Sequence, residues 1–68
     1  MEPPTHDEVV RRHLSRATCT VDQAAYVLNI NRNSAYQAVH SGEIPSMRVG
    51  RRILVSTYWL REQLGVEV

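Results

Sequence analysis

The sequence lacks lysine, contains a single cysteine and has no long hydrophobic run. One thiol, Cys19, cannot form a disulfide within the chain, which favours a reducing compartment such as the cytoplasm. No apolar stretch approaches the roughly 18 residues that a membrane-spanning helix needs, so we expect no membrane contact. The N-terminal segment MEPPTHDE is acidic and has no hydrophobic stretch, which argues against a secretory signal.

The patterns that carry enzyme or metal chemistry are also missing. No nucleophile has a base at motif spacing, and neither a glycine-rich phosphate loop nor a pair of carboxylates is present. The candidate metal ligands lack the usual spacing; they are His6, His13, His40 and Cys19. We therefore expect no enzyme, no metal site and no cofactor. A chain of 68 residues forms one small domain with a thin core, which favours a binding module.

All of the positive side-chain charge comes from arginine, and it is clustered. Residues 32–52 carry four arginines against one glutamate, a local charge of +3. Such a cluster is typical of a surface that faces phosphate, although a solvated face would have the same composition. A second cluster precedes residue 17 and is better explained as a solvated helix face, balanced by nearby acidic residues. It consists of Arg11, Arg12 and Arg16.

Capping residues predict the first two helices. A short helix is expected over about residues 6–15, with Val10 and Leu14 on one face. Thr20 and Gln23 form a capping-box pattern before a second helix, whose apolar residues recur at helical spacing. These residues are Val21, Ala24, Ala25 and Leu28.

The segment Asn29-Ile30-Asn31 interrupts this pattern and predicts a three-residue turn. We expect Asn29 to end the second helix, Ile30 to enter the core, and Asn31 to cap a third helix over about residues 32–41. A glycine and a proline shortly afterwards prevent its continuation. Two helices joined by such a turn predict a helix-turn-helix.

β-Branched residues around a central glycine predict a β-hairpin after the third helix. Its strands are expected at residues 46–49 and 52–55, with Gly50 and Arg51 at the tip. Leu54 should point outward, opposite to the inward-facing residues of the hairpin. Those are Met47, Val49, Ile53 and Val55.

A last helix is expected to follow a cap at Ser56 or Thr57 and to end at Gly65, with Leu60 and Leu64 inward. Its aromatic residues are best explained as packing residues; they are Tyr58 and Trp59. Exposure of Trp59 or Leu54 would instead mark a protein contact.

Residues 20–64 combine T-x-x-x-A-A-x-x-L, a tyrosine in the following short helix, G-x-(I/L)-P and x-R-V-G-R-R. This combination resembles the excisionase-like, MerR-related winged-helix domains. The resemblance implies a winged helix-turn-helix with a two-stranded β-hairpin wing. The N-terminal helix expected from its capping residues lies outside the motif, and together they make an α+β, mainly helical fold. We expect a flexible tail over residues 1–5 and a single DNA-binding domain over residues 6–68.

The resemblance implies a DNA-binding surface on the third helix and the wing. Its helix residues are Arg32, Asn33, Ser34, Tyr36 and Gln37, and its wing residues are Arg48, Arg51 and Arg52. The side-chain chemistry agrees, because Asn33 and Gln37 can pair with adenine and Arg32 with guanine or phosphate. His40 lies within reach of a phosphate, and Tyr36 suits a phosphate contact and packing against the wing equally well.

Three functions are compatible with these residues. Small phage and prophage members of the family act as excisionases, which bind and bend attachment-site DNA in the bacterial cytoplasm and direct integrase toward excision. Other members are small transcription regulators, which would use the same surface. The third hypothesis is an adaptor that binds mainly protein, such as integrase, through Leu54, Trp59 and the N-terminal helix. For the first, we expect several protomers side by side on double-stranded DNA.

Overall fold

The computed structural model describes residues 2–66 and contains four helices and three strands in this part of the chain. In order, they are α1 (His6–Leu14), β1 (Thr18–Thr20), α2 (Val21–Leu28), α3 (Arg32–Ser41), β2 (Ser46–Val49), β3 (Arg52–Ser56) and α4 (Thr57–Leu64). Residue 1 of the expected tail and residues 67–68 of the expected domain lie outside the described part. The prediction of a mainly helical α+β fold, a winged helix-turn-helix with an additional N-terminal helix, is confirmed.

The helix-turn-helix is set by local capping. The Thr20 hydroxyl accepts a hydrogen bond from Gln23 N, 3.1 Å, and Gln23 Oε1 accepts one from Thr20 N, 2.9 Å. These two bonds complete the predicted capping box at the start of α2. Asn31 Oδ1 accepts from Ser34 N, 2.7 Å, and caps α3 as predicted. Each bond satisfies a backbone group that would otherwise lack a partner in the first helical turn.

The turn between α2 and α3 corrects one expectation. Asn29 adopts the left-handed conformation, φ 58°, and ends α2 as predicted. Asn29 N donates to Tyr26 O, 3.2 Å, and Ile30 N donates to Ala25 O, 3.0 Å, which is the Schellman pattern of helix ends. Ile30 is nevertheless exposed. Its predicted burial is wrong because the turn carries its side chain past the edge of the core.

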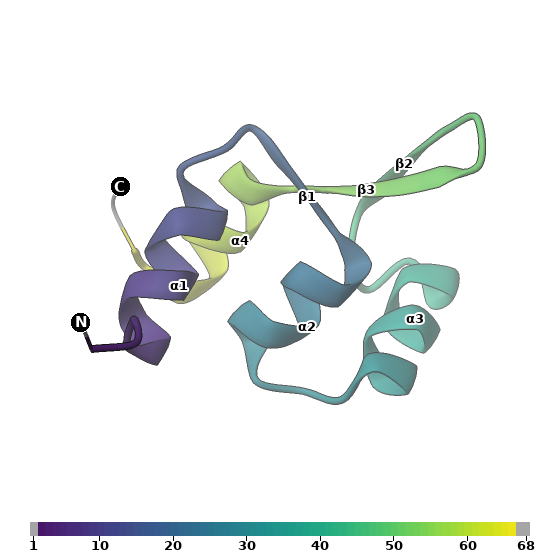
Figure 1. Ribbon diagram of the computed structural model, residues 1–68. Coiled ribbons are helices and arrows are strands. Elements are labelled where there is room, and N and C mark those ends of the chain that lie inside the picture. The colour runs from purple at the N-terminus through teal and green to yellow at the C-terminus, as the bar shows by residue number, and fades with distance from the viewer. Residues whose placement is uncertain (1, 67–68) are drawn as a thin grey trace.

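The hairpin forms part of a three-stranded antiparallel sheet with the order β1-β3-β2. Strand β1 was not predicted, since three residues are too few to show a period. It pairs with β3 and places Thr18 opposite Ser56 and Thr20 opposite Leu54. The sheet therefore joins the segment before α2 to the strand before α4 (Figure 1).

The register of the hairpin overturns part of the predicted alternation. The two-residue tip pairs Val49 with Arg52 and Met47 with Leu54, so Met47 and Val49 share a face with Leu54 rather than with Val55. They are 52% and 53% exposed, whereas Val55 is fully buried. The predicted inward positions of Met47 and Val49 are wrong, because the positions that share a face depend on the cross-strand register as well as on alternation.

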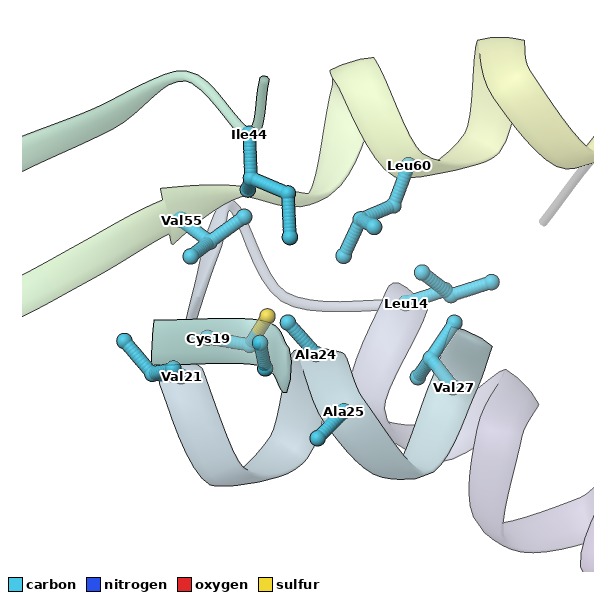
Figure 2. Packing of buried hydrophobic residues seen from close by; sticks show 10 residues of the cluster. Leu14, Cys19, Val21, Ala24, Ala25, Val27, Ile44, Val55 and Leu60 are labelled. Carbon is cyan, nitrogen blue, oxygen red and sulfur yellow. The ribbon is translucent and has the colours of Figure 1, made fainter. Parts of the chain in front are cut away.

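A small core lies between the sheet and the helices (Figure 2). Leu14, Leu60 and Val55 are its largest fully buried apolar residues, and Ile44 joins them from the loop between α3 and β2. Thr57 is fully buried as well. Its hydroxyl donates to the carbonyl oxygens of residues 16 and 17 and so ties α4 to the segment before β1.

Helix α4 packs beside α1 at the end of the molecule opposite to the tip of the hairpin (Figure 1). Its N-cap is Ser56, whose hydroxyl accepts from Trp59 N, 3.4 Å. Trp59 packs partly against the core, but Tyr58 is 61% exposed, so the packing role expected for Tyr58 is wrong. Leu64 is also exposed, contrary to expectation, because it lies one turn beyond Leu60, the last buried residue of the helix.

Candidate nucleic-acid interface

Helix α3 presents a polar face to solvent. Ala35 is fully buried, and Ala38 and Val39 pack partly against the core, so the apolar side of the helix is fixed. The exposed predicted site residues on this helix are Arg32, Asn33, Ser34, Gln37 and His40. The face can therefore enter a groove without exposing the core. The same polar residues would equally form a solvated surface if they stood alone.

The second predicted element, the arginine tip, lies beside this helix. A groove of about 360 Å³ separates α3 from β3, and Tyr36, Arg51 and Arg52 all line it. Its remaining walls come from the start of α2 and from β3: Thr20, Val21, Asp22, Ile53 and Leu54. Tyr36 is half-buried, so its ring forms part of the wall. The structure thus brings together three predicted site residues from two elements.

Arg32 is held by two partners. Its Nε lies 2.9 Å from Oδ1 of Asp22, and its guanidinium carbon lies 5.5 Å from the centroid of the Tyr36 ring. A hydrogen bond with Tyr36 and the charge of Asp22 raise the pKa of Arg32. Both side chains of the ion pair are largely exposed, 69% for Arg32 and 56% for Asp22. Such pairs contribute only about 0–1 kcal/mol to stability, so this one orients the guanidinium more than it stabilises the fold.

The arginines of the wing do not all lie on one face. Gly50 at the tip has φ +60°, a conformation that favours glycine, and Arg51 follows it. Arg52 pairs with Val49, whereas Arg48 pairs with Ile53, so Arg48 and Arg52 point to opposite faces of the hairpin. All three arginines are exposed. The groove contains Arg51 and Arg52 but not Arg48.

The two residues expected to contact protein have different environments. Leu54 is half-buried on the outer face of the sheet, in register with Met47 on one side and Thr20 on the other. Together with exposed Met47 and Val49 it forms an apolar strip along the wing. Trp59 is half-buried and packs against the core from α4.

Sequence reasoning missed Asp22 as part of this surface. Asp22 and Arg32 are ten positions apart and lie on different helices, so no spacing rule within one helix relates them. Only the angle between the two helices of the motif brings them together. The available signal was indirect: an aspartate in the first turn of α2, close to the cap of a helix-turn-helix.

Among residues 2–66, no group of three or more His, Cys, Asp or Glu side chains could hold a metal ion. Two of the histidines instead pack against Tyr26, with ring centroids 4.6 Å from His6 and 5.9 Å from His13. No helix in the same range is both long and apolar enough to cross a bilayer.

Comparison with known proteins identifies the motif. A family model described as a helix-turn-helix domain matches residues 18–63, from the start of β1 to near the end of α4. No curated protein and no solved structure gives a significant match. The matched segment spans about two thirds of the chain and contains the helix-turn-helix, the wing and the groove between them. The chain belongs to the helix-turn-helix domain family, whose members provide DNA-binding domains.

Proposed function

We propose that this protein binds double-stranded DNA sequence-specifically and acts as a phage or prophage excisionase. The observation that carries DNA binding is the groove in which Tyr36 of α3 meets Arg51 and Arg52 of the wing. A polar helix face or a basic hairpin alone would have a simpler explanation as a solvated surface. Side by side, they match the two contacts that a winged helix makes with a duplex, one with base edges and one with the backbone.

In this proposal α3 lies in the major groove and reads sequence. Asn33 and Gln37 pair with adenine through their amide groups, and Arg32 pairs with guanine. The remaining residues of this face are short or peripheral and contact the backbone; they are Ser34 and His40. Tyr36 donates its hydroxyl to a phosphate while its ring supports Arg32.

The wing provides the second set of contacts with the duplex. Arg51 and Arg52 enter the adjacent minor groove, where narrow A·T tracts concentrate negative potential. Arg48 contacts the backbone from the opposite face of the hairpin, the face that it shares with Ile53. These contacts carry little sequence information, so they set affinity and salt dependence rather than specificity.

The architectural role is the more specific part of the proposal. Several protomers bind side by side, bend attachment-site DNA and recruit integrase, in the cytoplasm of a bacterial host. Bending a site of 20–30 base pairs costs on the order of 1–6 kcal/mol, which the contacts of several protomers can offset. The helix-turn-helix domain family includes excisionase-like proteins, and its motif covers about two thirds of this chain.

The salt dependence of binding tests the wing. A duplex is first selected by the protein from a random pool, and its affinity is then measured over a range of salt concentrations. The affinity falls as salt rises, and replacing Arg51 and Arg52 by Ala should make this dependence shallower. The slope of log affinity against log salt should decrease in magnitude by about 1.8, at about 0.9 for each phosphate that is no longer neutralised. Arg12→Ala, on exposed α1, is the control for loss of a single charge away from the wing. An unchanged slope in the double variant would remove the wing from the proposal.

A recombination assay separates an excisionase from a transcription regulator with the same DNA surface. The cognate integrase acts on its attachment sites with and without this protein, and the proposal predicts that excision requires it. If excision proceeds equally well in its absence, the regulator becomes the better assignment.

The apolar strip of Met47, Val49 and Leu54 supports a second candidate, an adaptor that contacts integrase mainly through protein surfaces such as this strip and Trp59. The strip is partly exposed, and exposed apolar patches often mark sites of protein–protein contact. Absence of a specific complex at low salt with any duplex would favour the adaptor over the DNA-binding protein.

A further inference from the structure

We propose a second phosphate-binding site on the outer face of the sheet, where Arg16 holds the DNA backbone beside the wing residue Arg52. The proposal rests on the proposed DNA-binding function and extends the contact surface to a part of the chain not yet assigned a role. The site is a hollow of about 340 Å³ beside β1 and β3. Arg16 lies just before β1, and Arg52 begins β3.

The lining of the hollow is suited to an anion. Besides the two arginines, it consists of Ala17, Thr18, Cys19, Thr20, Gln23 and Leu54. None of these residues carries a carboxylate, whereas the neighbouring groove beside α3 includes Asp22. Hydroxyl, amide and guanidinium groups are the side chains that most often contact phosphate oxygens in protein–DNA complexes.

Several of these groups keep a donor available. The capping box uses Oε1 of Gln23 and the oxygen of Thr20 as acceptors, so the Nε2 amide of Gln23 and the hydroxyl proton of Thr20 are not consumed by it. Arg16 is exposed, and within residues 2–66 no carboxylate forms an ion pair with its guanidinium. The hollow therefore has two cationic groups and at least two neutral donors.

The single cysteine does not oppose an anion there. Burial raises the pKa of the Cys19 thiol to about 11, so the thiol stays neutral at physiological pH. Its neutrality leaves the positive charge of the two arginines uncompensated by the residues that line the hollow.

The hollow continues the DNA-facing groove. Both depressions share Thr20, Arg52 and Leu54, so a backbone that passes Tyr36 and Arg51 meets Arg52 next and then the hollow. Arg52 and Ser56 are the ends of β3, and Ser56 pairs with Thr18. The four residue steps from Arg52 to Ser56 span about 13 Å, so this surface extends well beyond the tip of the wing.

This assignment changes the explanation of the N-terminal basic cluster. If Arg16 belonged to a solvated helix face, acidic residues of α1 would balance its charge. However, Arg16 lies outside the helix, and the acidic residues Asp7 and Glu8 lie in its first turn, at the opposite end from Arg16. Arg16 is therefore separated from the arginines with which the sequence groups it, and it belongs to the sheet surface.

A pair of single variants tests the site in the intact protein. Arg16→Gln should reduce the salt slope for the selected duplex by about 0.9, which means that a fourfold rise in salt weakens binding about 3.5-fold less than in the unchanged protein. Arg12→Gln removes the same charge from exposed α1 and should change the slope by much less. Equal effects of the two variants would overturn the site, because general charge would then explain both. The Thr57 contact uses the backbone carbonyl of Arg16, so the fold does not depend on the replaced side chain.

A second measurement locates the contact on the DNA. Single phosphates of the selected duplex are replaced one at a time by neutral methylphosphonates, and binding is measured with the unchanged protein and with Arg16→Gln. At least one substitution should weaken the unchanged protein and leave the variant unaffected. If every substitution affects both proteins equally, Arg16 contacts no phosphate and the inference fails, while the effects of Arg51 and Arg52 would still support the proposed function.

Titration with inorganic phosphate distinguishes the source of the anion. Amide resonances of Thr18, Thr20 and Gln23 should shift with the duplex at concentrations where inorganic phosphate has no effect. Saturable shifts with inorganic phosphate at equally low concentration would overturn a DNA-backbone site in favour of a free-anion site. Failure of the unchanged protein to bind any duplex would overturn the proposed function and this inference together.

Discussion

At the scale of single residues, Arg32, which we propose as a base-reading residue, is already oriented by the fold. Asp22 from α2 and Tyr36 from α3 hold the guanidinium at the start of the exposed helix. A free arginine side chain loses conformational entropy when it is ordered on binding. An arginine that is already oriented loses less, and its planar donors are then positioned for one base geometry.

Asp22 should therefore increase selectivity while it decreases total affinity. Replacing it by Asn removes a negative charge near the phosphates and also releases Arg32. We expect Asp22→Asn to bind a shuffled duplex more tightly and to lose discrimination by roughly two- to fivefold, which is less than the ~1–3 kcal/mol of a complete bidentate contact. Fluorescence anisotropy with the selected and shuffled duplexes measures both quantities.

Glu43→Gln provides the matched comparison for this experiment. Glu43 is an exposed acidic residue in the segment after α3, and its loss should leave the ratio of the two affinities unchanged. If Asp22→Asn changes both affinities by the same factor, Asp22 acts only through its charge and does not position Arg32.

Cys19 gives the folded protein a predictable response to alkaline pH. Its thiol has an ordinary pKa near 9.0, and burial raises the pKa to about 11 in the folded state. Because the folded state holds this proton more tightly, the stabilisation is complete below about pH 9 and is lost as pH rises toward 11. The free energy of unfolding should therefore fall over this window. The part due to Cys19 should be absent from Cys19→Ala; identical curves for the two proteins would contradict the assignment.

At the scale of elements, each helix begins with a capping side chain: Thr5, Thr20, Asn31 and Ser56. Three helices end in a residue with positive φ, which is Asn29, Gly42 or Gly65. Caps act over three or four residues, which explains why the helix boundaries were predictable. They also fix the start of α3, where the candidate base-reading residues lie.

The capping box of α2 should be important for stability. Thr20→Ala removes a side-chain acceptor whose loss typically costs about 0.5–2 kcal/mol, and it leaves the backbone N–H of Gln23 without its acceptor. Thr5→Ala removes a single cap at the exposed start of α1 and should have a smaller effect. Chemical denaturation of both variants provides the comparison. A larger loss in Thr5→Ala would contradict the importance of the box.

The wing and the candidate site show where prediction from sequence fails. Alternation identified Val55 as inward, but the faces of Met47 and Val49 depend on their pairing across the hairpin. Ile30 and Leu64 are apolar residues next to helix ends, where burial depends on the extent of the core. Helical periodicity was enough to predict which side chains of α3 face solvent. The ion pair of Asp22 with Arg32 and the hollow at Arg16 were not, since each joins separate elements.

At the scale of the whole molecule, the described residues form an elongated body of 38 × 22 × 22 Å. Helix α3 and the tip of the wing lie at one end, and α1 packs with α4 at the other (Figure 1). A duplex bound at the first end leaves the second end accessible. The proposed arrangement of several protomers on one site requires such separation between DNA contact and protein contact.

The lengths of the helices bear on whether the protein associates with itself in solution. None of the helices in residues 2–66 is long enough to form an extended dimerisation coil, so we expect a monomer in solution and assembly on DNA. Sedimentation equilibrium should give a mass near 7.8 kDa without DNA, and several protomers should bind a long attachment-site duplex. A stable dimer without DNA would contradict this expectation.

Selection of DNA sequences by the protein and one variant tests the central claim most directly. The claim is that α3 reads sequence while the wing grips the backbone. Duplexes are selected from a random pool by the unchanged protein and by a variant in which Asn33 and Gln37 are both Ala. The account predicts a common sequence for the unchanged protein and weak, largely sequence-independent binding for the variant. Selection of the same sequence by both, or of no common sequence by the unchanged protein, would contradict it.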